Sequence, residues 1–120
     1  MEIQLESAEP HAIRSYSSHS IEVNNQTITQ SCIVTNTSIQ THWPIQNVEK
    51  LTPSDLEPLI QSAPEIIIIG HNTLQRPSPI IASYLSTQNI GFECMSLGAA
   101  CRTFNILLSE KRAVVLGIIL

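Results

Sequence analysis

The stretch EIIIIGHNTLQRPSP, Glu65 to Pro79, decides the fold class of this 120-residue chain. Four consecutive isoleucines that end at a glycine are typical of a strand buried on both faces, as in parallel sheets. Ser78 followed by Pro79 is the pattern of a helix start, in which a capping hydroxyl precedes a proline in the first turn. We therefore predict a strand at 66–69, then a loop, then a helix that begins at Ser78-Pro79.

The alternation of strand and helix patterns extends to both sides of this stretch. Helices are predicted within LTPSDLEPLIQSAP (51–64) and GAACRTFNILLSE (98–110), and strands within FECMS (92–96) and RAVVLGIIL (112–120). Such an alternation predicts a layered α/β domain in which strands 66–69, 92–95 and 114–119 share one sheet. The helices between them are expected to cross over that sheet.

The first of these helices has two candidate starts. Thr52 with Pro53 in the first helical position is one, and the capping box Ser54-x-x-Glu57 is the other. Pro58 favours the second start, because it then falls in the first turns of the helix.

Residues 1–44 have a β texture, with alternating runs and many β-branched residues. Asn24 and Asn25 separate two such runs and tolerate the positive φ of a tight hairpin turn. We expect this section either to add strands to the main sheet or to form a second small sheet against it. Because 120 residues suffice for only one worthwhile core, we predict a single domain over 1–120, with a β-rich section 1–44 and a βαβ-type section 51–120.

Composition excludes several classes of protein. Ten acidic and six basic side chains give a net charge of −4, and the basic ones are scattered, which argues against a nucleic-acid partner. Cys32, Cys94 and Cys101 lack metal-ligand or disulfide-framework spacing, so no metal site is expected. No cofactor is expected either. No apolar run is long enough to span a membrane, and the acidic, polar start lacks the pattern of a secretory signal. A cytoplasmic location is the expectation.

Two polar loops are expected at one end of the sheet. In open α/β sheets ligands bind beyond the carboxyl ends of the strands, where GHNTLQRPS (70–78) and SLGAAC (96–101) should lie side by side. A helix that starts near residue 98 adds free backbone N–H groups there. The candidate ligand- or partner-binding residues are Gly70, His71, Asn72, Thr73, Gln75, Arg76, Ser96, Gly98 and Arg102, with Asn105 beside Arg102 at helical spacing.

Each candidate feature has a second interpretation. Neither loop matches a phosphate-binding fingerprint, and Gly98 and its small neighbours could serve only close packing of the helix on the sheet. Arg102 is either part of a solvated polar stripe with Asn105 or is directed at a ligand or partner. Cys101, in the first turn of a helix, is either a nucleophile with His71 as its base or a small buried apolar residue. No catalytic residue is assigned.

The segments LTPSDLEPL, EIIIIGHNTLQRPSP and GFECMSLGAACRTFNILLSEKRAVVLGIIL resemble the small-domain family that includes mitochondrial complex I (NADH:ubiquinone oxidoreductase) assembly factor 3 and the adipogenesis-associated MTH-domain protein. The most specific part is AACRTFN (99–105), which matches the family core A-A-C-R-T-[YF]-N. Many relatives carry a second glycine near Asn72, which this chain lacks. The resemblance implies a three-layer MTH-like α/β domain with a central mixed, largely parallel sheet, and it suggests a bacterial homologue.

The expected function is that of a non-enzymatic binding or assembly module. For the mitochondrial relative the resemblance implies a chaperone-like role in assembling a membrane complex, so the expected partner is a protein, either an assembly factor or a membrane-complex subunit, with the chain a monomer or a homodimer. The alternative is a small enzyme or ligand carrier with a pocket for a small anionic ligand at the carboxyl end of the sheet. The lack of a nucleophile–base–orienter set favours the first, and the convergence of polar loops favours the second.

Overall fold

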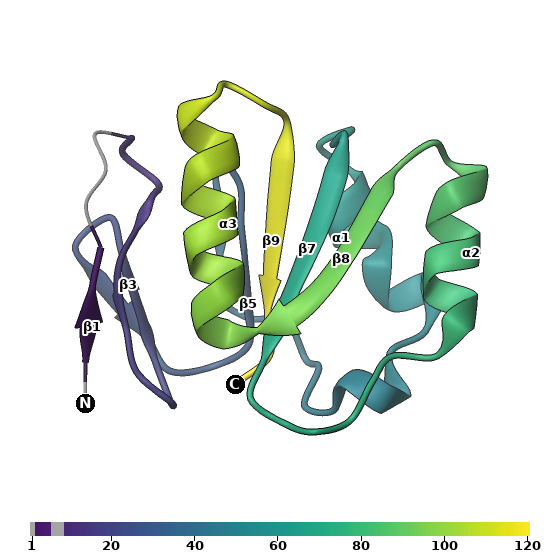
Figure 1. The fold of residues 1–120 in the computed structure, drawn as a ribbon, viewed down its shortest axis with the longest axis horizontal. Helices are drawn as coiled ribbons and strands as arrows, with labels where there is room; N and C mark the ends of the chain where they lie inside the picture. Colours follow the sequence, from purple (N-terminus) through teal and green to yellow (C-terminus); the bar gives the residue numbers. More distant parts are fainter. Residues whose placement is uncertain (1, 6–8) are drawn as a thin grey trace.

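The computed structural model describes residues 2–5 and 9–120 of the chain. Two sheets are present in this part. The smaller is antiparallel with strand order β1-β2-β3-β4, and the larger has the order β6-β5-β9-β7-β8 (Figure 1). The strands are β1 (Ile3–Gln4), β2 (Ile13–Tyr16), β3 (Ile21–Val23), β4 (Gln26–Ile28), β5 (Cys32–Val34), β6 (Ile39–Gln40), β7 (Ile66–His71), β8 (Gly91–Ser96) and β9 (Val114–Ile118).

The larger sheet confirms the predicted parallel core. β7 lies between β9 and β8 and is parallel to both, whereas β5 is antiparallel to β9 and β6 is antiparallel to β5. Ile67, Ile68 and Ile69 are fully buried, as the run of isoleucines predicts. The β-rich section does both things that its pattern allows, because β5 and β6 extend the main sheet while β1 to β4 form a sheet of their own.

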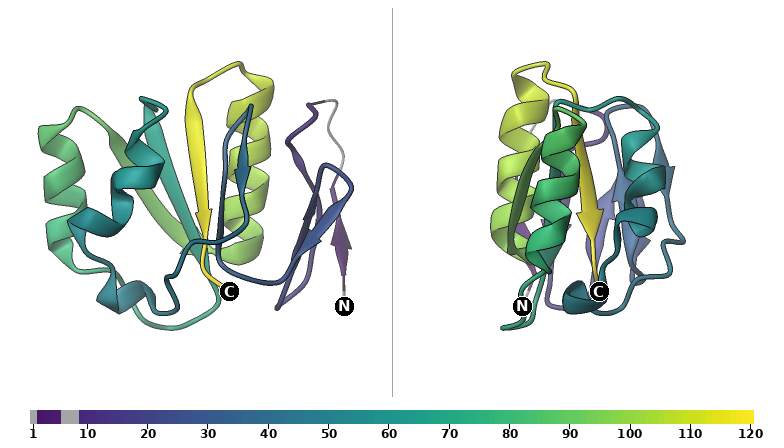
Figure 2. Two further views of the ribbon diagram at one scale, coloured as in Figure 1. Left: turned by 180° about the vertical axis from the view of Figure 1, so that it is seen from behind. Right: turned by 90° about the vertical axis from the view of Figure 1, so that its right-hand side faces the viewer.

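Helices cover both faces of the main sheet (Figure 2). On one face α3 (Leu97–Ser109) buries Phe104 and Leu108 against Ile68 and Leu116. The other face is covered by α1 (Glu57–Ile60) and α2 (Pro79–Thr87), whose apolar residues pack with Ile67. This is a mixed α/β fold with a helix layer on each side of its central sheet.

The start of α2 is the one predicted. Ser78 is the N-cap, its hydroxyl accepts a hydrogen bond from the Ile80 N–H at 3.4 Å, and Pro79 occupies the first turn. Hairpin formation at Asn24-Asn25 is confirmed as well, because these residues join β3 to β4 with φ values of 51° and 61°.

The favoured start of the first helix was wrong. A 3₁₀ helix, η2 (Pro53–Leu56), precedes α1, and Thr52 caps it with Asp55 in place of the Ser54–Glu57 box. The Asp55 carboxylate accepts a 2.8 Å hydrogen bond from the Thr52 N–H. Pro53 then occupies the first helical position, where its missing N–H leaves no bond unmade. A second short 3₁₀ helix, η1 (Val48–Lys50), lies just before it.

The small sheet packs on the side of α3, away from α2 (Figure 1). Its strand β2 contacts α3 directly and contributes Ile13 to the same core as Phe104. Within the described ranges, no helix has both the length and the apolar character needed to cross a membrane.

Candidate functional site

The two segments predicted to lie side by side do so, but only the first is a loop, because α3 begins at Leu97, directly after β8. β7 and β8 pair in parallel register with His71 opposite Ser96, so the loop after β7 and the start of α3 leave the sheet side by side. Both strands run toward the lower edge of the molecule in Figure 1, where β9 also ends. Parallel pairing therefore places the residues that follow each strand at one end of the sheet.

An open groove of about 720 Å³ lies at this end, and we refer to it as the β7–α2 groove. Five of the ten candidate residues line it, namely His71, Thr73, Gln75, Arg76 and Ser96. The others lining it are Leu74, Pro77, Pro79, Cys94 and Met95. The groove therefore combines a polar set of side chains with an apolar one, and it is formed by one loop, the edge strand β8 and the beginning of α2.

His71 is the most enclosed polar side chain of the groove, with 8% of its surface exposed. Its Nδ1 accepts a 3.3 Å hydrogen bond from the Thr73 N–H and lies 3.0 Å from Thr73 Oγ1. A backbone donor at Nδ1 places the proton of the neutral ring on Nε2. Burial lowers the pKa of His71, and the nearby charge of Glu49 opposes that shift.

The groove differs in charge from the chain as a whole. Arg76 is exposed within it, and none of the described side chains that line it is acidic, although the chain carries a net charge of −4. Ser96 is the N-cap of α3, but its hydroxyl makes no capping hydrogen bond. Guanidinium, imidazole N–H and hydroxyl groups are all hydrogen-bond donors toward an anion.

Asn72 faces a different neighbour. Its Nδ2 donates a 2.9 Å hydrogen bond to the Ser18 carbonyl, which ties the loop after β7 to the turn between β2 and β3. With His71 and Thr73 it lines a second hollow of about 320 Å³, beside the end of the chain at Leu120. This residue therefore joins the two sheets at the candidate end of the molecule.

Two small residues of the candidate set serve close packing. A Cβ at Gly70 would lie 2.6 Å from the Ala100 Cβ, so α3 rests directly on β7. At Gly98 a Cβ would lie 2.6 Å from Tyr16 Oη and 2.8 Å from its ring. Gly98 thus provides room for an aromatic side chain of the small sheet, which no local pattern predicts.

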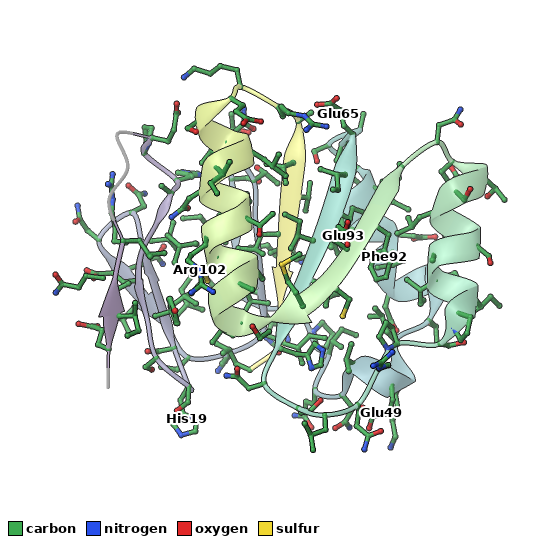
Figure 3. All side chains as sticks on the ribbon, viewed as in Figure 1. His19, Glu49, Glu65, Phe92, Glu93 and Arg102 are labelled. Atoms are coloured by element: carbon green, nitrogen blue, oxygen red, sulfur yellow. The ribbon has the colours of Figure 1, made fainter. Side chains whose placement is uncertain are left out.

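Arg102 lies on α3 next to the small sheet (Figure 3) and is exposed. Its Nη1 donates a 2.8 Å hydrogen bond to Tyr16 Oη. The side chain is therefore near the beginning of α3 but outside the set that lines the β7–α2 groove.

The expectation that Asn105 lies on a polar stripe beside Arg102 is corrected. Asn105 is 8% exposed, and its Oδ1 accepts a 2.8 Å hydrogen bond from the Ile13 N–H while its Nδ2 donates to the Ile13 carbonyl at 3.0 Å. The amide pairs with one residue of β2 as a neighbouring strand would. The N–H and the carbonyl of a buried residue such as Ile13 need hydrogen-bond partners, which is why the polar side chain of Asn105 faces inward.

The thiols have the character of buried apolar groups. Burial raises the pKa of Cys101 to about 12, and the adjacent Arg102 opposes this only in part. The pKa of Cys32 is raised to about 12 and that of Cys94 to about 11 by the same desolvation. These shifts disfavour the thiolate that a nucleophile requires, so the interpretation of Cys101 as a buried residue holds. Cys94 is half-buried.

Sequence reasoning missed Leu74 and Tyr16. Leu74 is completely exposed at the tip of the loop after β7 and lines the groove. Its signal was present, since it is a lone leucine within a polar loop of no helical or strand period. Tyr16 gave no signal, because its contacts with Gly98 and Arg102 join residues far apart in the sequence.

The fold defined by these elements is the Mth938-like one. A Bordetella pertussis protein whose solution structure is described as an Mth938-like domain superimposes with a TM-score of 0.76, at 22% identity, over 97% of this chain and 89% of that one. Residues 13–119 match the family described as a protein of unknown function (DUF498/DUF598). The chain belongs to this family.

Two relatives add sequence similarity to the shared fold. The NMR structure of a Xanthomonas campestris protein has 33% identity and a TM-score of 0.82, over 90% of this chain and 83% of that one. NADH dehydrogenase [ubiquinone] 1 alpha subcomplex assembly factor 3 of Xenopus tropicalis is 26% identical over 120 residues, which is 98% of this chain. The match covers 65% of that relative, so the chain spans slightly less than two thirds of its length. The predicted family resemblance is confirmed.

Proposed function

We propose that this chain is a non-enzymatic binding module that assists the assembly of a multisubunit complex, such as a respiratory or other membrane complex. The similarity to a complex I assembly factor supports an assembly-related role and a protein as the partner. In this proposal the chain acts in the cytoplasm, as a monomer or a homodimer, and holds a partner subunit without transforming it.

The observation that carries the proposal is the exposure of Leu74. Its side chain is 100% exposed, next to Pro77, Pro79 and Met95 in an open groove. An exposed leucine alone is ordinary, but one that joins other apolar groups along a groove is typical of a contact surface for another protein. The binding surface in this proposal is therefore the β7–α2 groove.

The chemistry of the described residues agrees with a binding role. The three thiols have raised pKa values, and the ring nitrogen of His71 that would act as a base is occupied by Thr73. Among the residues that the structure describes, no group of three His, Cys, Asp or Glu side chains is arranged to hold a metal ion.

A second candidate function is that of a carrier for a small anionic ligand, or a small enzyme acting on one. The observation in its favour is the donor set of His71, Arg76 and Ser96 in one groove. A carrier would bind a free anion in purified form, whereas an assembly module requires its protein partner.

Affinity capture from the native host tests the proposal. Wild type, Leu74→Asp and Ile106→Asp are compared, because Ile106 is another exposed apolar residue, 57% exposed on α3 and outside the groove. We expect Leu74→Asp to lose a subunit or assembly intermediate that wild type and Ile106→Asp retain, at an unchanged melting temperature. Equal capture by all three would contradict the proposed surface. A deletion strain that accumulates no assembly intermediate on native gels would contradict the role.

A further inference from the structure

The following inference rests on the proposed function and concerns the kind of ligand that the β7–α2 groove binds. We propose that it binds an extended partner segment through an Asp or Glu carboxylate, which is held by the His71 Nε2–H and the Arg76 guanidinium, while an adjacent apolar side chain packs on Leu74.

The His71 ring presents one unused donor. Nδ1 is paired with Thr73, and no hydrogen bond of Nε2 is found among the described residues. The described residues also contain no fully enclosed side-chain nitrogen or oxygen without a partner. Nε2 is therefore accessible from the β7–α2 groove or from the second hollow, both of which His71 lines, although the ring is only 8% exposed. A donor held in place by its own backbone neighbour needs little ordering when an acceptor binds.

Charge selects the acceptor. The groove contains Arg76 and a histidine N–H and no acidic lining residue among those described, in a chain with ten acidic and six basic side chains. The charge of Glu49 lies near His71 and opposes a carboxylate on that side, so the attraction comes from Arg76, which lines the same groove. Arg pairs with a carboxylate in a bidentate fashion, which gives direction as well as attraction.

Shape favours a polypeptide over a small ion. The groove is open and about 720 Å³ in volume, and half of its lining residues are Leu74, Pro77, Pro79, Cys94 and Met95. A free carboxylate such as acetate would leave these apolar groups uncovered. A peptide that carries an apolar residue beside its carboxylate would contact both sets at once.

A titration of the purified, ¹⁵N-labelled full chain tests this inference. The probes are acetyl-Leu-Glu-Leu-amide, its Gln counterpart and acetate alone, and the readout is the amide spectrum. We expect saturable shifts at residues 71–76 and 94–96 with the Glu peptide, and affinity about 10-fold lower for the Gln peptide, the usual value of one charge-assisted hydrogen bond. Arg76→Gln should reduce the difference between the two peptides, because only the His71 Nε2–H is then left to bind the carboxylate.

Arg112→Gln is the matched control, because it removes the same charge from a partly exposed arginine that pairs with Glu65 beyond the groove. It should bind as wild type does. Equal affinity for the Glu and Gln peptides, shifts outside the groove, or no saturable shift would overturn the inference. Acetate that binds as tightly as the Glu peptide would overturn the peptide assignment in favour of a small-anion site.

The two proposals fail in different ways. If Leu74→Asp loses its partner in the capture experiment while Arg76→Gln captures it normally, the assembly role stands and the carboxylate contact is wrong. If both variants capture the partner as wild type does, the groove is not the contact surface and the carboxylate contact is wrong as well, while the deletion strain decides the assembly role.

Discussion

Arg102 on α3 donates a 2.8 Å hydrogen bond to Tyr16 on β2, and this bond connects the main α/β layers to the small sheet. The tyrosine ring lies directly over Gly98, one turn earlier on the same helix. One side of the first turns of α3 therefore packs against the Tyr16 ring, and Arg102 binds the hydroxyl of that ring. The small residues of this helix and its arginine act together in holding the two sheets.

Arg102→Ala is expected to lower the free energy of unfolding by about 1 kcal/mol or less, because the side chain is exposed and its partner is neutral. A double-mutant cycle with Tyr16→Phe measures the pair by chemical denaturation. If Arg102 also contacts a partner, one of the two interpretations of its sequence context, the variant weakens capture of that partner while Tyr16→Phe does not. Unfolding at low denaturant with normal capture would make Arg102 purely structural.

Gly70→Ala is expected to destabilise the chain by about 1–3 kcal/mol, the usual range for overpacking a core. The added Cβ would lie 2.6 Å from that of Ala100 and 3.1 Å from Ile118 Cδ1. Gly91→Ala, at the start of the neighbouring strand, is the control, because its Cβ would meet atoms no closer than 3.5 Å. In thermal denaturation, Gly70→Ala should have a clearly lower melting temperature than Gly91→Ala. Adding Ala100→Gly should partly restore the melting temperature of Gly70→Ala.

Asn105→Leu is expected to cost about 2 kcal/mol or more, because it leaves the N–H and the carbonyl of buried Ile13 without partners. Asn105→Asp keeps an acceptor for the N–H but places a carboxylate against the carbonyl, so it should also destabilise. In Asn105→Leu, hydrogen exchange measured by NMR should accelerate relative to wild type, and more at Ile13 than in the β7 strand. Unchanged protection at Ile13 in Asn105→Leu would contradict the assigned role.

The cysteines are expected to be reduced, unpaired and slow to react. At pH 8 the raised pKa of Cys94, about 11, leaves its thiolate about 100-fold scarcer than at the ordinary value of 9.0. Cys32 and Cys101 are buried and should react with a thiol reagent only after unfolding. Mass spectrometry of the labelled native chain measures this, and rapid labelling of Cys101 or an intramolecular disulfide would refute it.

His71 is expected to make stability depend on pH below its ordinary pKa of 6.5. Burial lowers its pKa in the folded chain, so the unfolded chain takes up the proton first as pH falls. Stability is fully present above pH 6.5 and decreases between 6.5 and the lower folded pKa. In His71→Asn, whose side-chain oxygen can replace Nδ1 as the acceptor for Thr73, this decrease should be absent. Denaturation midpoints of both forms between pH 7.5 and about 5 measure the difference.

Local patterns in the sequence determined the α/β core. The isoleucine run of β7, the Ser78-Pro79 start of α2 and the Asn24-Asn25 turn are each set by residues within a few positions, and the structure has all three. The convergence of His71 and Ser96 also followed from the sequence, because parallel strands end at one edge of a sheet. The prediction of Ser54 over Thr52 as the helix cap was wrong. The sequence contains both capping patterns, and only the hydrogen bonds formed in the folded chain distinguish them.

Tertiary structure alone decided the roles of Asn105, Gly98 and Leu74. Asn105 is buried because β2 places Ile13 against it, and Gly98 is small because Tyr16 lies over it; both partners are more than 80 residues away. Leu74 is exposed because the loop extends beyond the sheet, next to a groove formed by three separate elements. Hydrophobic periodicity and helix capping depend on residues within one or two helical turns of each other. The contacts of Asn105, Gly98 and Leu74 exist only once the small sheet has packed on α3 and β7 has paired with β8.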